Sequence, residues 1–359
     1  MTQKKKVTIK DIAARMGISL STVNKALTGK PGISEKRRAE VIAVANEMGY
    51  VVNHVAQSLS RKPIRLGIII PSLWQQYYFA VEEGMRLELE KLVHSNVAGE
   101  VRHVSDPDET RKAFEYFFDE GVDAIVYSPS LLMLDESLCE YINNSGLPVF
   151  LVGGDCEGID NVSTVNINTE MSGHMAAELF SLCVPRDTAA AVFIGSKRMG
   201  VHAQKAEAFV RRASELGYTD VRVYETNEGT LSSIAMANEL FSTAERVGAI
   251  YIATGTASPI LEYVSRVEKD RRPVIVTTDI YDEIREGLKN GVITATVYQN
   301  QTLMGRLVIR TAYRYLVDRS SFGSEHNGIS PRMYVTPQLF LPSNLDGFKD
   351  DDGSGFTIE

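Results

Sequence analysis

The chain of 359 residues holds 46 Asp and Glu against 38 Lys and Arg, so its net charge is −8, and 44% of its residues are hydrophobic. That length is too great for one ordinary hydrophobic core and predicts two or three packed domains. The chain starts with lysines and has no apolar leader, which argues against secretion, and it has no run of about 18 apolar residues that could span a membrane. Its three cysteines lack C-x-x-C spacing, which argues against structural zinc or disulfides. Together these features favour the cytoplasm.

Residues 7–50 predict three short helices with start and stop signals. Thr8 and Asp11 have the spacing of a capping box before an apolar run, and Gly17 suits the left-handed position that ends a helix. Two further helices begin after residues with capping side chains, Ser19 and Ser34. Two helices joined by a tight turn form a helix-turn-helix, whose second helix has the right width for the DNA major groove.

The segment VTIKDIAARMGISLSTVNKALTGKPGIS at residues 7–34, followed by Glu47–Tyr50, strongly resembles the headpiece of the LacI/GalR (lactose-repressor) family of bacterial transcription regulators. The resemblance continues through Asn53–Leu59 and Arg65–Pro71 and extends more loosely over nearly the whole chain. It implies an N-terminal all-α helix-turn-helix headpiece and an α/β, periplasmic-binding-protein-like core of two parallel-sheet lobes. It also implies a homodimer on a near-palindromic operator of double-stranded DNA.

The distribution of charge independently favours DNA binding at one end of the chain. Residues 1–65 hold 13 Lys and Arg and 4 Asp and Glu, a net charge of +9, whereas residues 66–359 hold 25 and 42, a net charge of −17. A small basic module on an acidic body is the expected layout for contact with phosphate at one end only. The excess of positive charge in residues 1–65 predicts that the affinity for DNA falls steeply as the salt concentration rises.

The resemblance assigns DNA contacts to the second helix of the headpiece. Leu20, Ser21 and Lys25 match the positions that approach base edges. The family more often has Ser-Arg where this chain has Asn24 and Lys25, which leaves the half-site sequence open. Other polar residues suit phosphate contacts or helix caps, namely Thr8, Ser19, Thr22, Asn24 and Asn53.

Residues 51–62 match the hinge helix of the family, which pairs with its dimer mate and folds when the operator is bound. Val55, Ala56 and Leu59 are the DNA contacts that this match predicts. Leu59 falls where the family wedges a leucine into a minor-groove step to kink it. A helix this short is marginal by itself in water, so a plain linker is the alternative.

After residue 63, short β-branched runs alternate with amphipathic helices, which indicates parallel sheets covered on both faces. Predicted strands are 66–71, 100–104, 124–127, 149–152, 191–194, 221–224, 249–253, 274–277 and 294–297, and predicted helices include 77–94, 108–120, 170–183, 202–216 and 303–317. So many strands predict two lobes within residues 63–345. The family resemblance implies crossings between the lobes near Asn168, Gln299 and Arg332, the last one sending residues 333–341 to the second lobe. Residues 346–359 predict an acidic disordered tail.

Ligands of such a fold sit in the crevice at the carboxyl ends of the strands. The side chains expected to contact a sugar or sugar derivative there are Trp74, Tyr77, Tyr78, Ser128, Asp155, Arg198, Lys205, Thr254, Asp279 and Gln299. Asp279 is the strongest candidate, because a carboxylate accepts several hydrogen bonds from a polyol, and Gln299 adds a donor and an acceptor. An anionic effector would favour Arg198 or Lys205, whereas a neutral sugar would favour Asp155, Asp279 and Gln299.

The sequence contains no constellation that supports catalysis. It has no G-x-x-x-x-G-K-S/T phosphate loop, no G-x-S-x-G elbow and no H-E-x-x-H spacing, and His174 and His202 are expected in surface or core roles. We therefore expect a sequence-specific transcriptional regulator, foremost a repressor, without enzymatic activity, metal or cofactor. The alternatives are an enzyme with a DNA-binding appendage and a solute receptor without a transcriptional role. Effector identity, induction or corepression, and dimer or tetramer stay open.

Overall fold

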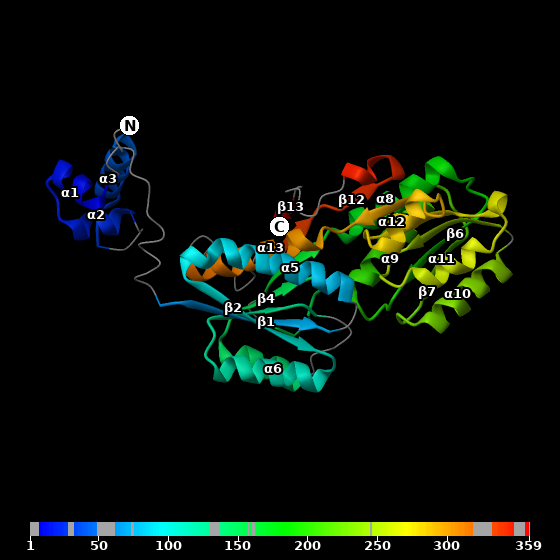
Figure 1. Ribbon diagram of the computed structural model, residues 1–359, viewed down its shortest axis with the longest axis horizontal. Helices are drawn as coiled ribbons and strands as arrows, with labels where there is room; N and C mark the ends of the chain where they lie inside the picture. Colours follow the sequence, from blue (N-terminus) through cyan, green and yellow to red (C-terminus); the bar gives the residue numbers. More distant parts are fainter. Residues whose placement is uncertain are drawn as a thin grey trace. The chain divides into compact units, whose positions relative to one another are not determined.

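The computed structural model describes residues 7–27, 32–48, 62–72, 75–129, 136–156, 158–159, 162–244, 246–318, 332–347 and 356–358 (Figure 1). Contacts within the chain divide it into two units, Met1–Lys62 and Pro63–Glu359. The described part of the first unit is helical, and the second unit alternates strands and helices. None of the helices in these ranges is both long enough and apolar enough to cross a bilayer.

The first unit packs three helices around a small apolar core. The helices are α1 (Ile9–Met16), α2 (Leu20–Leu27) and α3 (Glu35–Glu47). Their facing sides bury six residues, which are Ile12, Ala13, Val23, Ala26, Val41 and Ala45. A core of this size supplies little stabilising free energy, so the helix ends contribute a sizeable share.

The predicted helix caps of the first unit are confirmed. Thr8 Oγ1 accepts a hydrogen bond from the Asp11 backbone N at 3.4 Å, and Asp11 Oδ2 accepts one from the Thr8 backbone N at 2.8 Å. Gly17 ends α1 in the left-handed conformation, with φ of 62°. Ser19 and Ser34 accept hydrogen bonds from the backbone N atoms three residues later, at 3.1 and 3.3 Å. Local sequence therefore determines where these helices begin and where α1 ends.

The second unit contains two sheets, one in each lobe. The first-lobe sheet has the strand order β13-β11-β5-β4-β3-β1-β2 and consists of β1 (Ile64–Pro71), β2 (Val97–Val104), β3 (Ala124–Tyr127), β4 (Val149–Val152), β5 (Val162–Ile167), β11 (Arg332–Val335) and β13 (Phe356–Ile358). The second-lobe sheet has the order β12-β10-β9-β8-β6-β7 and consists of β6 (Ala189–Ile194), β7 (Val221–Glu225), β8 (Val247–Ile252), β9 (Val274–Thr278), β10 (Ala295–Tyr298) and β12 (Gln338–Phe340). Described strand pairs are parallel except at β13 and β12, the antiparallel edge strands.

Helices cover both faces of each sheet (Figure 1). In the first lobe, α5 (Gln75–Leu92) and α13 (Gln301–Val317) lie side by side on one face, and the other face carries α6 (Pro107–Asp119) and α7 (Glu136–Ser145). In the second lobe, one face is covered by α8 (Thr169–Cys183) and α9 (Gly200–Glu215), and the other by α10 (Thr230–Thr243), α11 (Ser258–Ser265) and α12 (Asp282–Lys289). Short 3-10 turns are η1 (Val93–Ser95), η2 (Lys269–Arg271) and η4 (Pro342–Gly347).

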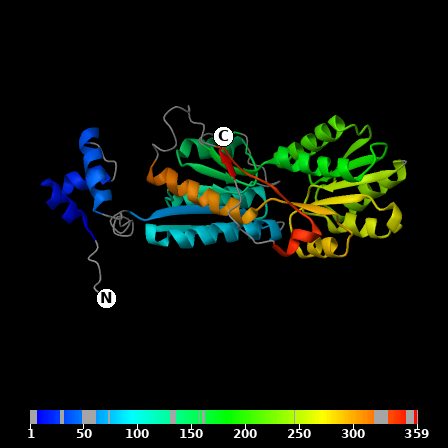
Figure 2. The same ribbon diagram turned by 90° about the horizontal axis from the view of Figure 1, so that it is seen from above.

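All nine predicted strands are present, but β5, β11, β12 and β13 were not anticipated. Strand β5 buries Ser163, Thr164 and Asn166, so it lacks the apolar run that marked the other central strands. The last crossing, expected near Arg332, lies a few residues later at residues 336–337, because β11 pairs with β5 in the first lobe and β12 with β10 in the second (Figure 2). The tail expected to be disordered contains β13, whose backbone pairs with β11.

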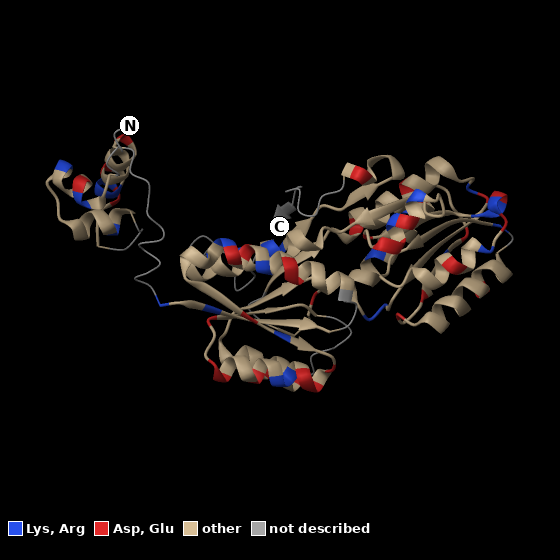
Figure 3. Cartoon of the chain, in the orientation of Figure 1, with Lys and Arg blue, Asp and Glu red and all other residues tan. Residues whose placement is uncertain are grey.

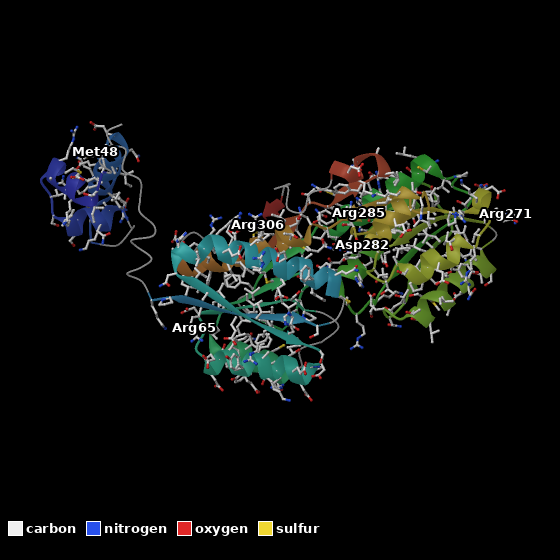
Figure 4. All side chains as sticks on the ribbon, in the orientation of Figure 1. Met48, Arg65, Arg271, Asp282, Arg285 and Arg306 are labelled. Carbon is white, nitrogen blue, oxygen red and sulfur yellow. The ribbon has the colours of Figure 1, made fainter. Side chains whose placement is uncertain are left out.

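An ion cluster around the buried carboxylate of Glu88 joins α5 to α13. The carboxylate of Glu88 accepts hydrogen bonds from Arg310 at 2.8 and 3.0 Å and from Arg306 at 3.4 Å. Figure 4 labels Arg306, which lies on α13. Burial by itself would raise the pKa of Glu88, but the hydrogen bonds from Arg310 and Arg306 outweigh it and hold the pKa below its ordinary value. Acidic and basic residues lie close together along these two helices (Figure 3).

Glycine permits the close approach of α5 and α13. A Cβ atom on Gly305 would lie 1.9 Å from the Val81 carbonyl oxygen, and one on Gly84 would lie 2.0 Å from the Thr302 carbonyl oxygen. We expect Gly305→Ala to lower the free energy of unfolding by about 3 kcal/mol, because backbone atoms have to separate. Gly200→Ala, with nothing within 4 Å of the added Cβ, is expected to change it by less than about 0.5 kcal/mol. Urea unfolding of both variants measures this, and equal midpoints would contradict the packing argument.

Candidate functional site

Helix α2 presents the predicted base-contacting residues on its solvent side. Leu20 is 43% exposed, and Ser21 and Asn24 are also exposed, opposite the buried face of the helix. Lys25 is half-buried, and its Nζ lies near the following turn, 3.3 Å from the position a Cβ on Gly32 would take. Helix α2 therefore carries an apolar side chain, a hydroxyl, an amide and an ammonium group. These are groups that can recognise base edges and phosphates.

The remaining headpiece candidates have structural contacts of their own. Thr8 and Ser19 are exposed residues whose hydroxyls cap helices, and Ser19 Oγ lies 2.9 Å from the Thr22 hydroxyl. Capping is thus shown for Thr8 and Ser19, and phosphate contact remains a prediction. The predicted contacts that follow the headpiece lie outside the described residues, namely Asn53, Val55, Ala56 and Leu59.

A cavity lies between the two lobes of the second unit, and its empty space, part of which is open to solvent, measures about 580 Å³. The first lobe contributes residues of α5 and the ends of β4 and β5, and the second lobe contributes α9 and the loops after β7, β8, β9 and β10. Six of the ten predicted effector residues line it: Tyr77, Tyr78, Lys205, Thr254, Asp279 and Gln299.

Three other predicted residues are not among those that line the cavity. The Ser128 hydroxyl donates to the Val152 carbonyl oxygen at 2.9 Å and is fully buried, so it joins two strand ends. Asp155 accepts a hydrogen bond from Asn166 Nδ2 at 3.1 Å. Arg198 is exposed in the loop before α9. The tenth predicted residue, Trp74, lies outside the described residues.

Asp279 is the centre of a buried hydrogen-bond network after β9. Its Oδ1 accepts a hydrogen bond from the Gln299 backbone N at 3.2 Å, and its Oδ2 accepts from Gln299 Nε2 at 2.8 Å and from the Tyr281 hydroxyl at 3.0 Å. Gln299 Oε1 in turn accepts from Lys205 Nζ at 2.6 Å. Burial raises the pKa of Asp279 above its ordinary value, although Lys205 and these hydrogen bonds act against it. The network fixes the directions of polar groups at the cavity wall.

Three tyrosines add aromatic faces to this polar wall. Tyr77 and Tyr78 meet edge to face, with ring centroids 5.1 Å apart. Gly153 leaves room for one of them, since a Cβ there would lie 2.6 Å from the Tyr77 hydroxyl oxygen. Burial raises the pKa of Tyr77 and Tyr281 well above the ordinary value, so both are neutral phenols. Rings beside hydrogen-bonding groups suit a ligand with an apolar face and a polar rim.

Lys205 is expected to make ligand binding depend on pH. It is 2% exposed, and burial lowers its pKa to about 8, so the ammonium is lost as the pH rises through that value. A neutral sugar that accepts a hydrogen bond from Nζ should therefore bind roughly tenfold more weakly at about pH 9 than at about pH 7. Isothermal titration measures this beside Lys205→Met, which should show no such dependence. The same fall in both proteins would show that Lys205 is not responsible.

Two ionisable residues that sequence reasoning did not assign to the site also line the cavity. Glu228 follows β7 in the left-handed conformation, with its side chain 7% exposed. His202 Nδ1 on α9 accepts a hydrogen bond from the Ser196 backbone N at 3.3 Å. Burial, and secondarily the charge of Lys205, lower the pKa of His202 to about 3, so the imidazole is neutral. The expected surface or core role of His202 is thus replaced by a place in the cavity wall.

The other lining residues are mostly small or apolar, namely Gly153, Ile167, Met199, Val201, Ala253, Gly255, Thr278 and Tyr281. Such residues carry little chemical signal in a sequence. Glu228 follows the predicted strand 221–224, which is a weak signal, but the conformation of the loop after β7 is what brings its side chain to the cavity. Within the described ranges, no group of three His, Cys, Asp or Glu is placed to hold a metal ion.

Two family models match the chain in different places. The model for periplasmic binding protein domains matches residues 66–320, and the model for bacterial regulatory proteins of the lacI family matches residues 8–53. The chain belongs to the lacI family of bacterial regulatory proteins. This lacI-family chain is a DNA-binding transcriptional regulator, and the predicted fold class is confirmed.

The lacI-family chain is similar to catabolite control protein A of Staphylococcus xylosus, with 27% identity over 257 residues, 70% of this chain and 71% of that protein. A match to the protein of the same name from Staphylococcus epidermidis has 26% identity and spans 48% of this chain and about half of that protein, 51%. Among solved structures, the regulator CelR in complex with cellobiose has a TM-score of 0.62 at 20% identity, covering 94% of this chain and 99% of CelR. AraP, an arabinose-binding protein of Geobacillus stearothermophilus, has a TM-score of 0.66 at 19% identity, covering 80% and 100%.

Proposed function

We propose that this lacI-family regulator is a repressor and that a sugar or sugar derivative between its lobes sets its affinity for operator DNA. The cavity wall carries the proposal, because Asp279, Gln299 and Lys205 hold hydrogen-bonding groups in fixed directions beside Tyr77. A polyol offers hydroxyls that can satisfy such a carboxylate, amide and ammonium together. Two similar structures support the same ligand class, the CelR complex with cellobiose and the arabinose-binding protein AraP.

The two-lobed wall supports a mechanism for control. A ligand that contacts Tyr77 of the first lobe and Asp279 of the second prefers the lobe arrangement in which both reach it. That preference shifts the population of lobe arrangements, and we propose that the shift changes the order of residues 51–62 and hence the affinity for DNA. We propose induction, in which the sugar-bound form releases the operator.

The DNA-binding form is proposed to be a homodimer on a near-palindromic operator in the bacterial cytoplasm, associated with the nucleoid. Leu20, Ser21 and Lys25 are proposed to approach base edges, while Val55, Ala56 and Leu59 contact the minor groove, where Leu59 acts as a wedge. Phosphate contacts are proposed for Thr8, Ser19, Thr22, Asn24 and Asn53. Two-fold symmetry of the protein would then be matched by the DNA site.

Selection of duplexes from a randomised library by the full-length chain tests this function. We expect a near-palindromic sequence to be enriched, with an affinity that falls roughly 10³-fold between about 50 and 200 mM salt, because several phosphates are neutralised. A sugar from a mono- and disaccharide panel should raise the melting temperature and release the enriched duplex. Sugar binding without any sequence preference would instead indicate a solute receptor, and turnover of the bound sugar would indicate an enzyme.

A further inference from the structure

One buried carboxylate in the cavity wall has no cationic partner within ion-pair distance among the residues that the structure describes. We infer that the effector carries a protonated amine that binds this carboxylate, Glu228. The inference rests on the proposed function, because it names the chemical class of ligand for the same cavity. An amino sugar combines such an amine with the hydroxyls suited to Asp279 and Gln299.

The backbone after β7 is built to place Glu228 in the wall. Asn227 and Glu228 both have the left-handed conformation, with φ of 49° and 56°, which residues other than glycine seldom adopt. Gly195, after β6, provides the space, since a Cβ there would lie 1.8 Å from Glu228 Oε1. The Asn227 backbone N also donates to the Gly195 carbonyl oxygen at 2.7 Å, which ties the two loops together. Backbone strain held in this way is typical of functional sites.

Only neutral groups hydrogen-bond the Glu228 carboxylate within the described ranges. Thr254 Oγ1 lies 2.6 and 2.7 Å from its two oxygens, and Thr256 Oγ1 donates at 2.5 Å. His202 Nδ1 lies 3.9 Å from Oε1, but it accepts a hydrogen bond from the Ser196 backbone N and therefore carries no proton there. With its side chain 7% exposed, this charge is poorly screened by water until a cation reaches it.

The charges around the cavity do not balance. Lys205 is the one ammonium among the described lining residues, and it faces two carboxylates, Asp279 and Glu228. Asp279 is the stronger of these two partners, and Lys205 donates its hydrogen bond to Gln299, which itself binds Asp279. The remaining negative charge repels phosphosugars and sugar acids and attracts an amine.

Isothermal titration of the full-length chain with matched sugars tests the inference. D-Glucosamine, D-galactosamine and D-mannosamine are each measured beside the parent sugar and the N-acetyl derivative, at a pH where the amine is protonated. We expect at least one amine to bind about tenfold or more tightly than both uncharged counterparts, because a charge-assisted hydrogen bond to a buried carboxylate is strong. In Glu228→Gln this preference should vanish, so that the amine and its parent sugar bind with affinities within about twofold of each other.

A second measurement does not depend on sugar stereochemistry. Without ligand, Glu228→Gln should melt at the same temperature as the native chain or higher, because the change removes an uncompensated buried charge. Asp279→Asn is the matched contrast and should melt lower, because the Gln299 backbone N that donates to that carboxylate cannot accept a hydrogen bond from the new amide, whereas the threonine hydroxyls beside Glu228 can. A carboxylate with only a structural role at position 228 would also give a lower melting temperature.

Either of two results would overturn the inference: no amine outranks its uncharged counterparts, or ligand-free Glu228→Gln melts below the native chain. If neutral sugars then bind and release the enriched duplex, the proposed function stands without the amine. If amines bind preferentially through Glu228 but no sugar alters DNA binding, the inference stands and the proposed regulation fails.

Discussion

Residues 63–359 by themselves are expected to bind the sugar as the full chain does and to lose affinity for the operator by about 10³-fold or more. The removed part contains α1, α2 and α3 and nearly all of the basic segment, residues 1–65, whose net charge is +9. The remainder is strongly acidic and repels phosphate. The cavity and the four core clusters of the two lobes lie wholly within the retained unit, which begins at Pro63.

Fluorescence anisotropy with the enriched duplex measures the first half of this expectation, and isothermal titration with the panel sugar measures the second. A cooperative melting transition of residues 63–359 serves as the control for folding. Sequence-specific DNA binding that survives the truncation would mean that the lobes read the operator. Loss of sugar binding in a folded fragment would mean that residues 1–62 support the cavity.

Asp279→Asn is expected to weaken sugar binding by roughly 10- to 100-fold and to shift DNA release to correspondingly higher sugar concentrations. The native carboxylate accepts hydrogen bonds from Gln299 and Tyr281, and the amide that replaces it brings a donor toward those donors and removes the charge. Asparagine suits the backbone, because position 279 has φ of 70° and asparagine tolerates that region. The loss should therefore reflect ligand chemistry more than a rearranged loop.

Asp155→Asn is the matched control. Asp155 is also a carboxylate after a strand of the second unit, but it bonds Asn166 and is not a lining residue. Its replacement should leave sugar affinity within about twofold. Isothermal titration and the sugar concentration at half release of the duplex give the two readouts. Equal losses in both variants would show that the strand ends, not the Asp279 network, set the affinity.

Local sequence signals predicted much of this molecule because the forces behind them are local. The hydroxyl of Thr8 and the carboxylate of Asp11 form a cap within one turn of helix, and the freedom of Gly17 needs no distant partner. Apolar runs marked nine strands because both faces of each sheet are covered. The same rule could not find β5, where the polar residues Ser163 and Asn166 are buried by their neighbours in the fold.

The candidate site was predicted where strand order decides position, and missed where loop conformation does. Asp279 and Gln299 follow neighbouring parallel strands, so their meeting is a consequence of the sheet. Ser128 follows a strand by the same rule, yet its hydroxyl bonds Val152 and lies outside the cavity wall. Glu228 reaches the cavity because Asn227 and Glu228 are left-handed and because Gly195 leaves space beside it. These features of backbone geometry could not be predicted from the residue types.

The sequence by itself determined the family, the three capped helices of the headpiece, the alternation of strands and helices, and the residues at most strand ends, since each depends on neighbours along the chain. Only the tertiary structure decided which of those side chains face one cavity, that Lys205 shares it with two carboxylates, and that residues 332–335 return to the first lobe. Those outcomes depend on contacts between segments far apart in sequence, and burial among such segments sets the pKa of groups like Lys205 and His202.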